Sequence, residues 1–204
     1  MYKRQDNDLY GSDYTIGYDT AVNTALDAID KIRDTADAHE RAFFVELMGR
    51  DTGYIAVRSA ISGGAEMALI PEQRLSIQEI SEKLKSGDEA SKGSHIIIVA
   101  EGDEAGNAIE IAKQVKEAVP SLDTKVTTLG HIQRGGQPTA ADRVLATRLG
   151  LAAVEGLREG KSGVMVGVIN HDVVYSTLDD AINKEKPVNP ELIRLIDTLN
   201  GRVY

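Results

Sequence analysis

The sequence predicts an α/β protein of three layers, in which helices cover both faces of a mostly parallel sheet. Helix-like and strand-like segments alternate along the 204 residues, which is the pattern of such folds. The segment 95–100 is a continuous apolar run rich in β-branched residues, typical of a strand buried inside a parallel sheet. Its carboxyl end leads to Glu101-Gly102, at the edge where open α/β sheets bind their ligands.

Apolar residues at helical spacing predict the helices. They are expected, in chain order, over residues 13–36, 54–61, 76–87, 105–118 and 138–160, followed by two short helices of which the last covers 190–199. Gly63-Gly64 ends the second helix, and Ser76 with Glu79 forms the capping box that begins the third. Pro138-Thr139 begins the longest one.

Continuous apolar runs predict the strands. These are expected, in chain order, over residues 42–48, 67–70, 95–100, 125–129 and 164–169. Pro71 stops the second strand, because proline cannot continue a ladder of hydrogen bonds. The run at 125–129 leads directly into the most informative motif of the chain.

Composition limits the classes of function. A length of 204 residues, 42% hydrophobic and 27% charged, suits one large or two small domains of a soluble globular protein. No apolar run reaches the ~20 residues that cross a bilayer, and the start has no signal-peptide pattern. The absence of cysteine excludes thiolate chemistry and favours the cytoplasm. A net charge of −9 argues against a nucleic-acid partner.

The motif Gly130–Gly136 places an imidazole, a carboxamide and a guanidinium within four residues, beside glycines that allow close approach of a ligand. Arg134 offers a planar fork for phosphate oxygens, and His131 can add a charge-assisted hydrogen bond. This pattern favours a phosphorylated, hydroxyl-rich small molecule. The alternative is a polar turn whose glycines only fit the backbone.

A second motif, Asp6-Asn7-Asp8, carries two carboxylates. In an extended segment Asp6 and Asp8 would project to one side, so that one can act as a general base while the other helps to hold Mg²⁺. A simple turn is the alternative, since these residue types favour turns.

Further candidates follow or begin the predicted strands. Met48-Gly49-Arg50 and Glu101 follow strands and suit contacts to phosphate or sugar hydroxyls, while Arg41 and Lys125 lie near strand beginnings. Each has a simpler interpretation: solvent-facing arginines, an acid that complements a helix dipole, and an edge-strand lysine.

A scattered set consists of Gly63-Gly64-Ala65-Glu66, Arg33 and Lys92. Spacing alone does not unite these residues, and their simpler interpretation is a helix C-cap with two surface cations. The sequence contains no P-loop, Rossmann fingerprint, paired-histidine zinc motif or serine elbow.

Taken in order, several of these segments resemble the bacterial-type ATP-dependent 6-phosphofructokinases over nearly the whole chain. The segments that carry the resemblance are Asp6-Asn7-Asp8, Gly11–Gly17, Val45–Arg50, Glu101-Gly102 and Gly130–Gly136. The resemblance implies transfer of the γ-phosphoryl group of MgATP to the 1-hydroxyl of fructose 6-phosphate. The alternatives are a pyrophosphate-dependent enzyme of the same type and a non-catalytic module that senses sugar phosphate or nucleotide.

The resemblance also implies roles for individual residues. Asp6 is the general base and Asp8 lies near the metal. The sugar contacts fall on Met48, Gly49, Arg50, Glu101, His131 and Arg134. Arg41 and Lys125 reach the 6-phosphate from a neighbouring subunit of a homotetramer, with Lys125 replacing the usual arginine. Arg33, Gly64, Glu66 and Lys92 match an allosteric site for ADP, GDP or phosphoenolpyruvate.

The glycine-rich ATP segment of the family would precede Asp6. We therefore expect a remnant of the ATP and catalytic domain over 1–17, a fructose 6-phosphate domain over 18–130, and a segment over 131–204 that returns to the ATP domain. On this expectation, the 204-residue chain alone binds fructose 6-phosphate weakly and shows little or no kinase activity.

Overall fold

The structure is a computed structural model that describes residues 6–35, 41–88, 94–102 and 106–199. The chain forms two compact units. The sheet unit comprises Val22–Gln133 and Val188–Tyr204, and the hairpin unit comprises Met1–Ala21 and Arg134–Pro187. Within the described ranges, no helix combines the length and the apolar character that crossing a bilayer requires.

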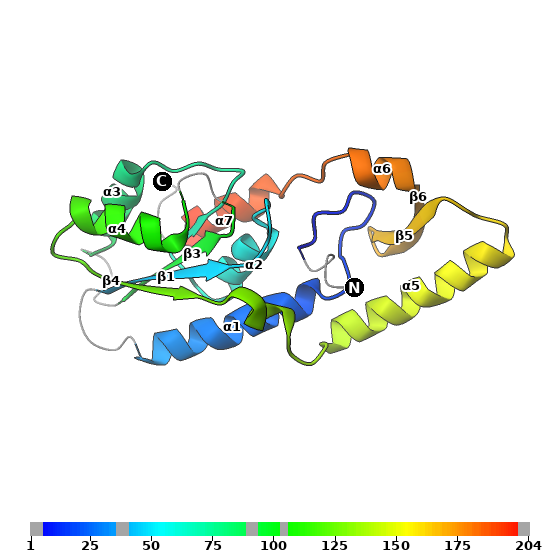
Figure 1. Ribbon diagram of the computed structural model, residues 1–204, viewed down its shortest axis with the longest axis horizontal. Helices are drawn as coiled ribbons and strands as arrows, with labels where there is room; N and C mark the ends of the chain where they lie inside the picture. The colour runs from blue at the N-terminus through cyan, green and yellow to red at the C-terminus, as the bar shows by residue number, and fades with distance from the viewer. Residues whose placement is uncertain (1–5, 36–40, 89–93, 103–105, 200–204) are drawn as a thin grey trace. The chain divides into compact units, whose positions relative to one another are not determined.

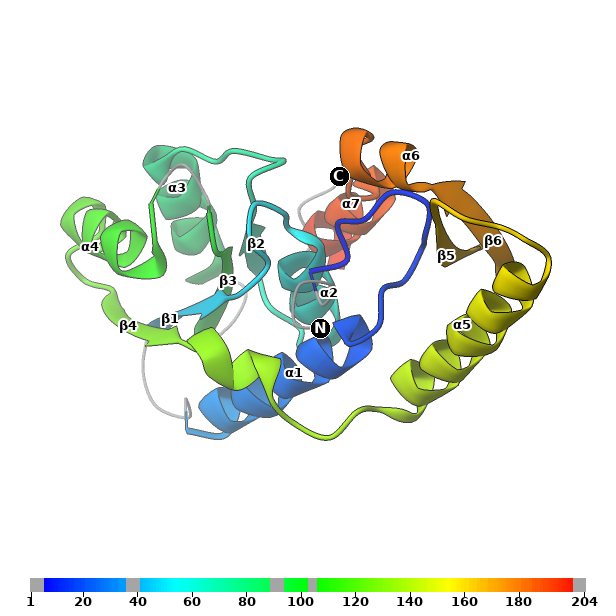
Figure 2. The same cartoon turned by 45° about the vertical axis from the view of Figure 1, so that its right-hand side comes forward.

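The sheet unit is built on a four-stranded, all-parallel sheet with the strand order β2-β3-β1-β4 (Figure 1, with β2 labelled in Figure 2). The strands are β1 (Arg41–Leu47), β2 (Met67–Leu69), β3 (His95–Ala100) and β4 (Asp123–Thr128). All six residues of β3 are buried, because this strand has a neighbour on each side and helices over both faces. The sequence prediction of a buried parallel strand at this place is confirmed.

Helices cover both faces of this sheet. They are α1 (Tyr18–Thr35), α2 (Tyr54–Ser62), α3 (Ile77–Asp88), α4 (Ala108–Ala118) and α7 (Pro190–Leu199). Phe44 and Ile97 share a core with Leu84 of α3 and Val115 of α4. In the strand order, the step from β1 to β2 runs toward one edge of the sheet, and the step from β3 to β4 runs toward the other edge. Right-handed crossovers therefore place α2 on the other face, and the three-layer prediction is confirmed.

Helix boundaries follow local hydrogen bonds. The capping box at Ser76 is confirmed, since its backbone N–H donates to Glu79 at 2.7 Å and its hydroxyl accepts from the Glu79 N–H at 3.2 Å. The predicted start of α4 at residue 105 is wrong. Asn107 accepts from the backbone N–H of Glu110 and forms a second capping box, so that the helix begins at Ala108.

The hairpin unit contains an antiparallel pair, β5 (Val164–Ile169) and β6 (Asp172–Thr177), beside the long helix α5 (Ala140–Arg158) (Figure 2). The predicted strand at β5 is confirmed, but its partner β6 was not predicted. The turn between them consists of Asn170 and His171, both with positive φ, which is the geometry of a tight hairpin turn. A short helix, α6 (Leu178–Asn183), follows β6.

The boundaries between the two units lie after Ala21, Gln133 and Pro187. The expected division of the chain at residues 17 and 130 stays a prediction. The last helix, α7, belongs to the sheet unit, where it contacts α2 and β2.

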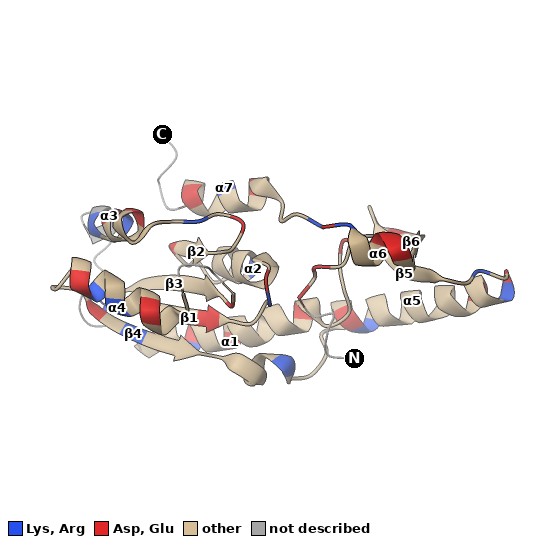
Figure 3. Cartoon of the chain, turned by 45° about the horizontal axis from the view of Figure 1, so that its top comes forward, with Lys and Arg blue, Asp and Glu red and all other residues tan. Residues whose placement is uncertain are grey.

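Charged residues of both signs are interspersed along α3 and α4 (Figure 3).

Candidate functional site

Three strands of the sheet unit deliver predicted site residues to one edge. Because β1, β3 and β4 are parallel, their carboxyl ends lie together. Met48-Gly49-Arg50 follow β1, Glu101 follows β3, and His131 lies in the 3₁₀ helix η2 (Gly130–Arg134) that follows β4. Arg50 and His131 are exposed and Glu101 is half-buried. The edge therefore presents two cationic or polar groups and one carboxylate to a ligand.

Backbone hydrogen bonds tie these strand ends together. The Glu101 N–H donates to the carbonyl of Leu47 at 2.8 Å, and the Leu129 N–H donates to the carbonyl of Glu46 at 3.1 Å. Both bonds extend the parallel ladder by one residue beyond the strands. The loops that carry Glu101 and His131 therefore start from fixed positions on β1.

Gln133 adds a side-chain link that the sequence analysis did not assign. Its Oε1 atom accepts a hydrogen bond from the backbone N–H of Met48 at 2.9 Å, and the residue is 1% exposed. The motif contained the signal, because a carboxamide between a histidine and an arginine is a polar group that must find a partner if it is buried. Gln133 joins η2 to the first residue after β1.

The backbone around Arg50 requires glycine at two positions. Arg50 itself has a φ of 58°, an uncommon conformation for a residue with a side chain. A Cβ atom on Gly49 would lie 2.7 Å from the carbonyl oxygen of Thr52, and one on Gly102 would lie 2.6 Å from that of Arg50. The loops after β1 and β3 thus approach each other closely at Gly102, which places Arg50 next to the residue that follows Glu101.

The acidic motif lies in the hairpin unit and forms a turn. Asn7 has a φ of 62°, so the segment is not extended at this residue, and of the two alternatives the structure shows the turn. The Asn7 side chain explains the turn: its Oδ1 accepts from the N–H of Thr15 at 2.9 Å, and its Nδ2 donates to the carbonyl of Asp13 at 3.1 Å. Asp6 is 2% exposed, and a terminal nitrogen of Arg134 lies 3.2 Å from its Oδ1.

Lys186 also binds the acidic turn. Its ammonium group donates to the backbone carbonyls of Asn7 at 2.9 Å and Asp13 at 3.0 Å. Burial lowers the pKa of Lys186 to about 8, although the negative charges of Asp13 and Asp8 act in the opposite direction. Lys186 was not predicted, because nothing in its local sequence connects it with a turn that lies 179 positions away.

The acidic turn fits part of a Mg²⁺ site. Asp8 Oδ1 is buried and makes no hydrogen bond to the rest of the described chain. Among the residues that the structure describes, no three histidine, cysteine, aspartate or glutamate side chains come together as a metal cage. Since Mg²⁺ usually takes one or two carboxylates and completes its shell with water and substrate phosphates, Asp8 suits the role that the resemblance implies.

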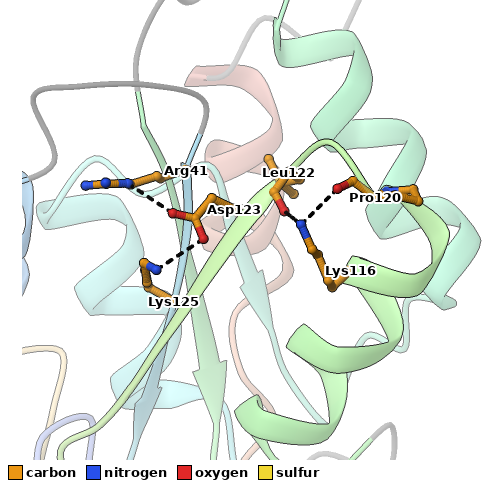
Figure 4. A network of polar contacts seen from close by, with 6 residues as sticks. All are labelled: Arg41, Lys116, Pro120, Leu122, Asp123 and Lys125. Carbon is orange, nitrogen blue, oxygen red and sulfur yellow. Dashed lines mark hydrogen bonds and ion pairs between the residues drawn. The ribbon is translucent and has the colours of Figure 1, made fainter.

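Arg41 and Lys125 do not join the carboxyl edge of the sheet. Arg41 begins β1 opposite Asp123, and Lys125 lies opposite Phe43, so both are at the amino ends of their strands. Asp123 binds both cations (Figure 4). Their implied role toward a neighbouring subunit stays a prediction.

The residues of the expected allosteric site are partly brought together. Arg33 donates from its guanidinium group to the carbonyls of Gly63 and Gly64. Both carboxylate oxygens of Glu66 lie 2.8 Å from Nδ1 of His95, a histidine that is 0% exposed. His95 was not predicted, although a polar residue at the start of an apolar strand was visible in the sequence. Lys92 lies outside the described residues.

Comparison with known proteins gives consistent results. The family model described as phosphofructokinase matches residues 3–157. An ATP-dependent 6-phosphofructokinase of Cytophaga hutchinsonii is 67% identical over 199 residues, which are 98% of this chain and 61% of that protein. One of Thermus thermophilus is 50% identical over 194 residues, covering 95% of this chain and 60% of that protein. The chain therefore spans about 60% of the length of these curated relatives.

Solved structures show the same fold. Phosphofructokinase from Saccharomyces cerevisiae aligns with a TM-score of 0.79 at 30% identity, over 97% of this chain and 26% of that one. A pyrophosphate-dependent phosphofructokinase from Marinobacter aquaeolei aligns with a TM-score of 0.78 at 24% identity, over 92% of this chain and 53% of that one. The second likeness concerns the fold alone. The family match and the curated relatives show that this chain belongs to the phosphofructokinase family.

Proposed function

We propose that the chain binds fructose 6-phosphate at the carboxyl edge of its parallel sheet and serves in phosphoryl transfer from MgATP to the 1-hydroxyl of the sugar. The observation that supports this most strongly is the common position of Arg50, Glu101 and His131 after three neighbouring parallel strands. A hexose monophosphate carries hydroxyl groups for Glu101 and anionic oxygens for Arg50 and His131. Met48 and Gly49 provide backbone at the same edge.

The catalytic role is assigned to Asp6 as general base and to Asp8 as a ligand of Mg²⁺. Phosphoryl transfer depends on alignment and charge neutralisation more than on covalent chemistry. Bound Mg²⁺ would supply such neutralisation at the phosphates. The Asn7 turn and Lys186 hold the two carboxylates in place, and Arg134 balances the charge of Asp6.

ATP is the proposed donor, because the relatives from Cytophaga hutchinsonii and Thermus thermophilus are named ATP-dependent 6-phosphofructokinases. We further propose a homotetramer in which Arg41 and Lys125 serve the 6-phosphate bound to a neighbouring subunit. A nucleoside diphosphate or phosphoenolpyruvate would bind at Arg33, Gly64, Glu66 and Lys92. Cytoplasmic localisation stays a prediction.

Calorimetric titration tests the substrate. Fructose 6-phosphate should bind to the chain, and unphosphorylated fructose should bind at least tenfold more weakly, because it lacks the charge-assisted hydrogen bonds. Arg50→Ala should weaken fructose 6-phosphate binding by about tenfold or more, since each charged hydrogen bond is worth about 1.5–3 kcal/mol. Arg158→Ala, an exposed arginine of α5, serves as the control. Equal affinities for all three proteins would contradict the assignment.

Product analysis tests the reaction. Because the 204-residue chain alone is expected to show little or no kinase activity, it should form only a trace of fructose 1,6-bisphosphate from MgATP and fructose 6-phosphate. This trace should be lost in Asp6→Asn, while the binding of the sugar phosphate remains. Product formation that Asp6→Asn leaves unchanged would contradict the role of Asp6 as general base, and robust turnover by the wild-type chain would contradict the expected low activity.

A further inference from the structure

Asp123 holds the two cations that the proposed function assigns to the sugar phosphate. Its Oδ2 atom accepts from Nε of Arg41 at 3.2 Å, and its Oδ1 lies 3.1 Å from Nζ of Lys125 (Figure 4). Each carboxylate oxygen therefore serves one cation. The hydrogen bond from Lys125 is the main cause of the lowered pKa of Asp123, with further contributions from the charges of Lys125 and Arg41. At neutral pH the carboxyl is a full anion between two cations.

The register of the sheet produces this arrangement. Arg41 and Asp123 are direct partners across β1 and β4, and directly opposed residues project to the same face. Lys125 lies two residues after Asp123 and projects to that face as well. The side chains of Arg41, Asp123 and Lys125 are 36%, 49% and 51% exposed. The cluster is therefore open to a ligand from solvent or from another subunit.

A third cation nearby is committed elsewhere. Lys116, at the end of α4, donates to the carbonyl oxygens of Pro120 at 2.8 Å and Leu122 at 2.7 Å (Figure 4). It closes the turn between α4 and β4. Among the residues that the structure describes, the charged groups of this cluster are the cations of Arg41 and Lys125 and the anion of Asp123.

We propose that Asp123 is an internal competitor for the phosphate group and thereby a specificity-determining residue. Its carboxylate occupies Arg41 and Lys125 until a stronger anion displaces it. A phosphate monoester carries about −1.5 to −2 charges at neutral pH and three acceptor oxygens, so it can replace a single carboxylate. A free monoanion that binds Arg41 and Lys125 no more strongly than a carboxylate does not displace Asp123, because the Asp123 carboxylate is already held beside the two cations by the chain. The inference rests on the proposed role of Arg41 and Lys125 in phosphate binding.

The size of the effect follows from Coulomb's law. A unit negative charge about 5–6 Å from a bound anion, in a partly solvated setting, changes anion affinity by about three- to tenfold. Loss of the Asp123 charge should therefore tighten phosphate binding by that factor. Loss of the Asp123 charge should also tighten the binding of a monoanion such as formate by at least the same factor, because neither formate nor phosphate then competes with the carboxylate.

The test uses inorganic phosphate as the probe, titrated into the ¹⁵N-labelled chain while the Arg41 Nε–H resonance is followed by NMR. Asp123→Asn should lower the Kd for phosphate by about three- to tenfold and should make formate binding detectable. Asp172→Asn, an exposed aspartate of β6, changes the net charge equally and should leave both affinities unaltered. Circular dichroism confirms folding, and Asp123→Thr is a second variant that suits a strand.

The outcomes separate the inference from the proposed function. If Arg41→Ala abolishes phosphate binding but Asp123→Asn and Asp123→Thr bind phosphate no more tightly than wild type, Asp123 is no competitor and the proposed function is unaffected. If Arg41→Ala leaves phosphate binding unchanged, phosphate does not bind at this cluster, and both the inference and the assigned role of Arg41 are wrong. An equal gain in Asp172→Asn would mean that net charge alone explains the effect.

Discussion

A terminal guanidinium nitrogen of Arg134 lies 3.2 Å from Oδ1 and 3.5 Å from Oδ2 of Asp6, although 128 positions separate the two residues in the chain. The side chain of Asp6 is 3% exposed and that of Arg134 is 19% exposed. This ion pair joins the two most informative motifs of the sequence within the hairpin unit. A buried carboxylate of this kind depends on its partner, because an unpaired charge away from water is costly.

The pair predicts a strong coupling between the two residues. Arg134→Met should lower the free energy of unfolding by about 2–3 kcal/mol, since it removes a cationic partner from the buried Asp6 carboxylate. Asp6→Asn in the same chain should restore part of that loss, with a coupling energy of at least about 1 kcal/mol in a double-mutant cycle. Urea denaturation of the four proteins measures it. Strictly additive effects would show that the ion pair is not formed in solution.

The backbone conformation at Gly102 predicts that the proposed sugar site requires glycine at this position. Gly102→Ala should destabilise the chain by about 1–3 kcal/mol and weaken fructose 6-phosphate binding, because φ is +86° and the added Cβ would lie 2.6 Å from the Arg50 carbonyl oxygen. Gly150→Ala in α5 is the matched control. Its Cβ would meet nothing within 4 Å, and alanine should stabilise the helix by about 0.5–1 kcal/mol. Chemical denaturation and calorimetry check both variants, and a neutral Gly102→Ala would contradict the described loop contact.

Lys186 predicts a pH dependence of stability. The folded chain holds its pKa at about 8, whereas an unfolded chain returns it to about 10.4. Between these values the unfolded state binds more protons, so the free energy of unfolding should rise with pH. Relative to Lys186→Gln, wild type should gain stability from about pH 8 to about pH 10 in urea denaturation.

The control for this pH effect is Lys184→Gln. The hydrogen bond with Asp180 raises the pKa of Lys184 above its usual value, so this variant should follow the wild-type pH dependence over the same range. A difference between wild type and Lys186→Gln that does not change with pH would mean that Lys186 is not desolvated.

The position of Arg33 predicts that an effector binds at a site separate from the site for fructose 6-phosphate. Its guanidinium group holds the carbonyls of Gly63 and Gly64 and lies in the sheet unit with Glu66 and His95. Arg33→Ala should weaken ADP binding by about tenfold or more, while fructose 6-phosphate binds as to wild type. Calorimetry with each ligand measures this. Unchanged ADP affinity would remove Arg33 from the proposed allosteric site.

The parallel sheet was predictable because its signals are local. The buried run of β3, the capping box at Ser76 and the stop at Pro71 act within a few residues of the elements they define. β6 was missed because a half-exposed strand with little apolar periodicity gains its stability from pairing with β5. Its Asn170-His171 turn lacks the glycine that usually identifies such a hairpin.

The candidate site was predictable only in part. Residues that follow strands, such as Arg50 and Glu101, could be placed because parallel topology brings strand ends together. Lys186, Gln133 and Asp123 act through contacts with distant segments, and no spacing rule connects them in advance. The φ of Asn7 was likewise set by contacts, in this case with Asp13 and Thr15.

The central claim is that a sugar phosphate binds at the carboxyl edge of β1, β3 and β4. Titration of fructose 6-phosphate into the ¹⁵N-labelled chain, followed by amide chemical shifts, tests it most directly. We expect the amides of Gly49, Gly102 and Gly130 to shift together with one Kd, while those of Gly150 and Gly160 in the hairpin unit stay unchanged. Saturable binding that shifts none of the three edge glycines would contradict the claim.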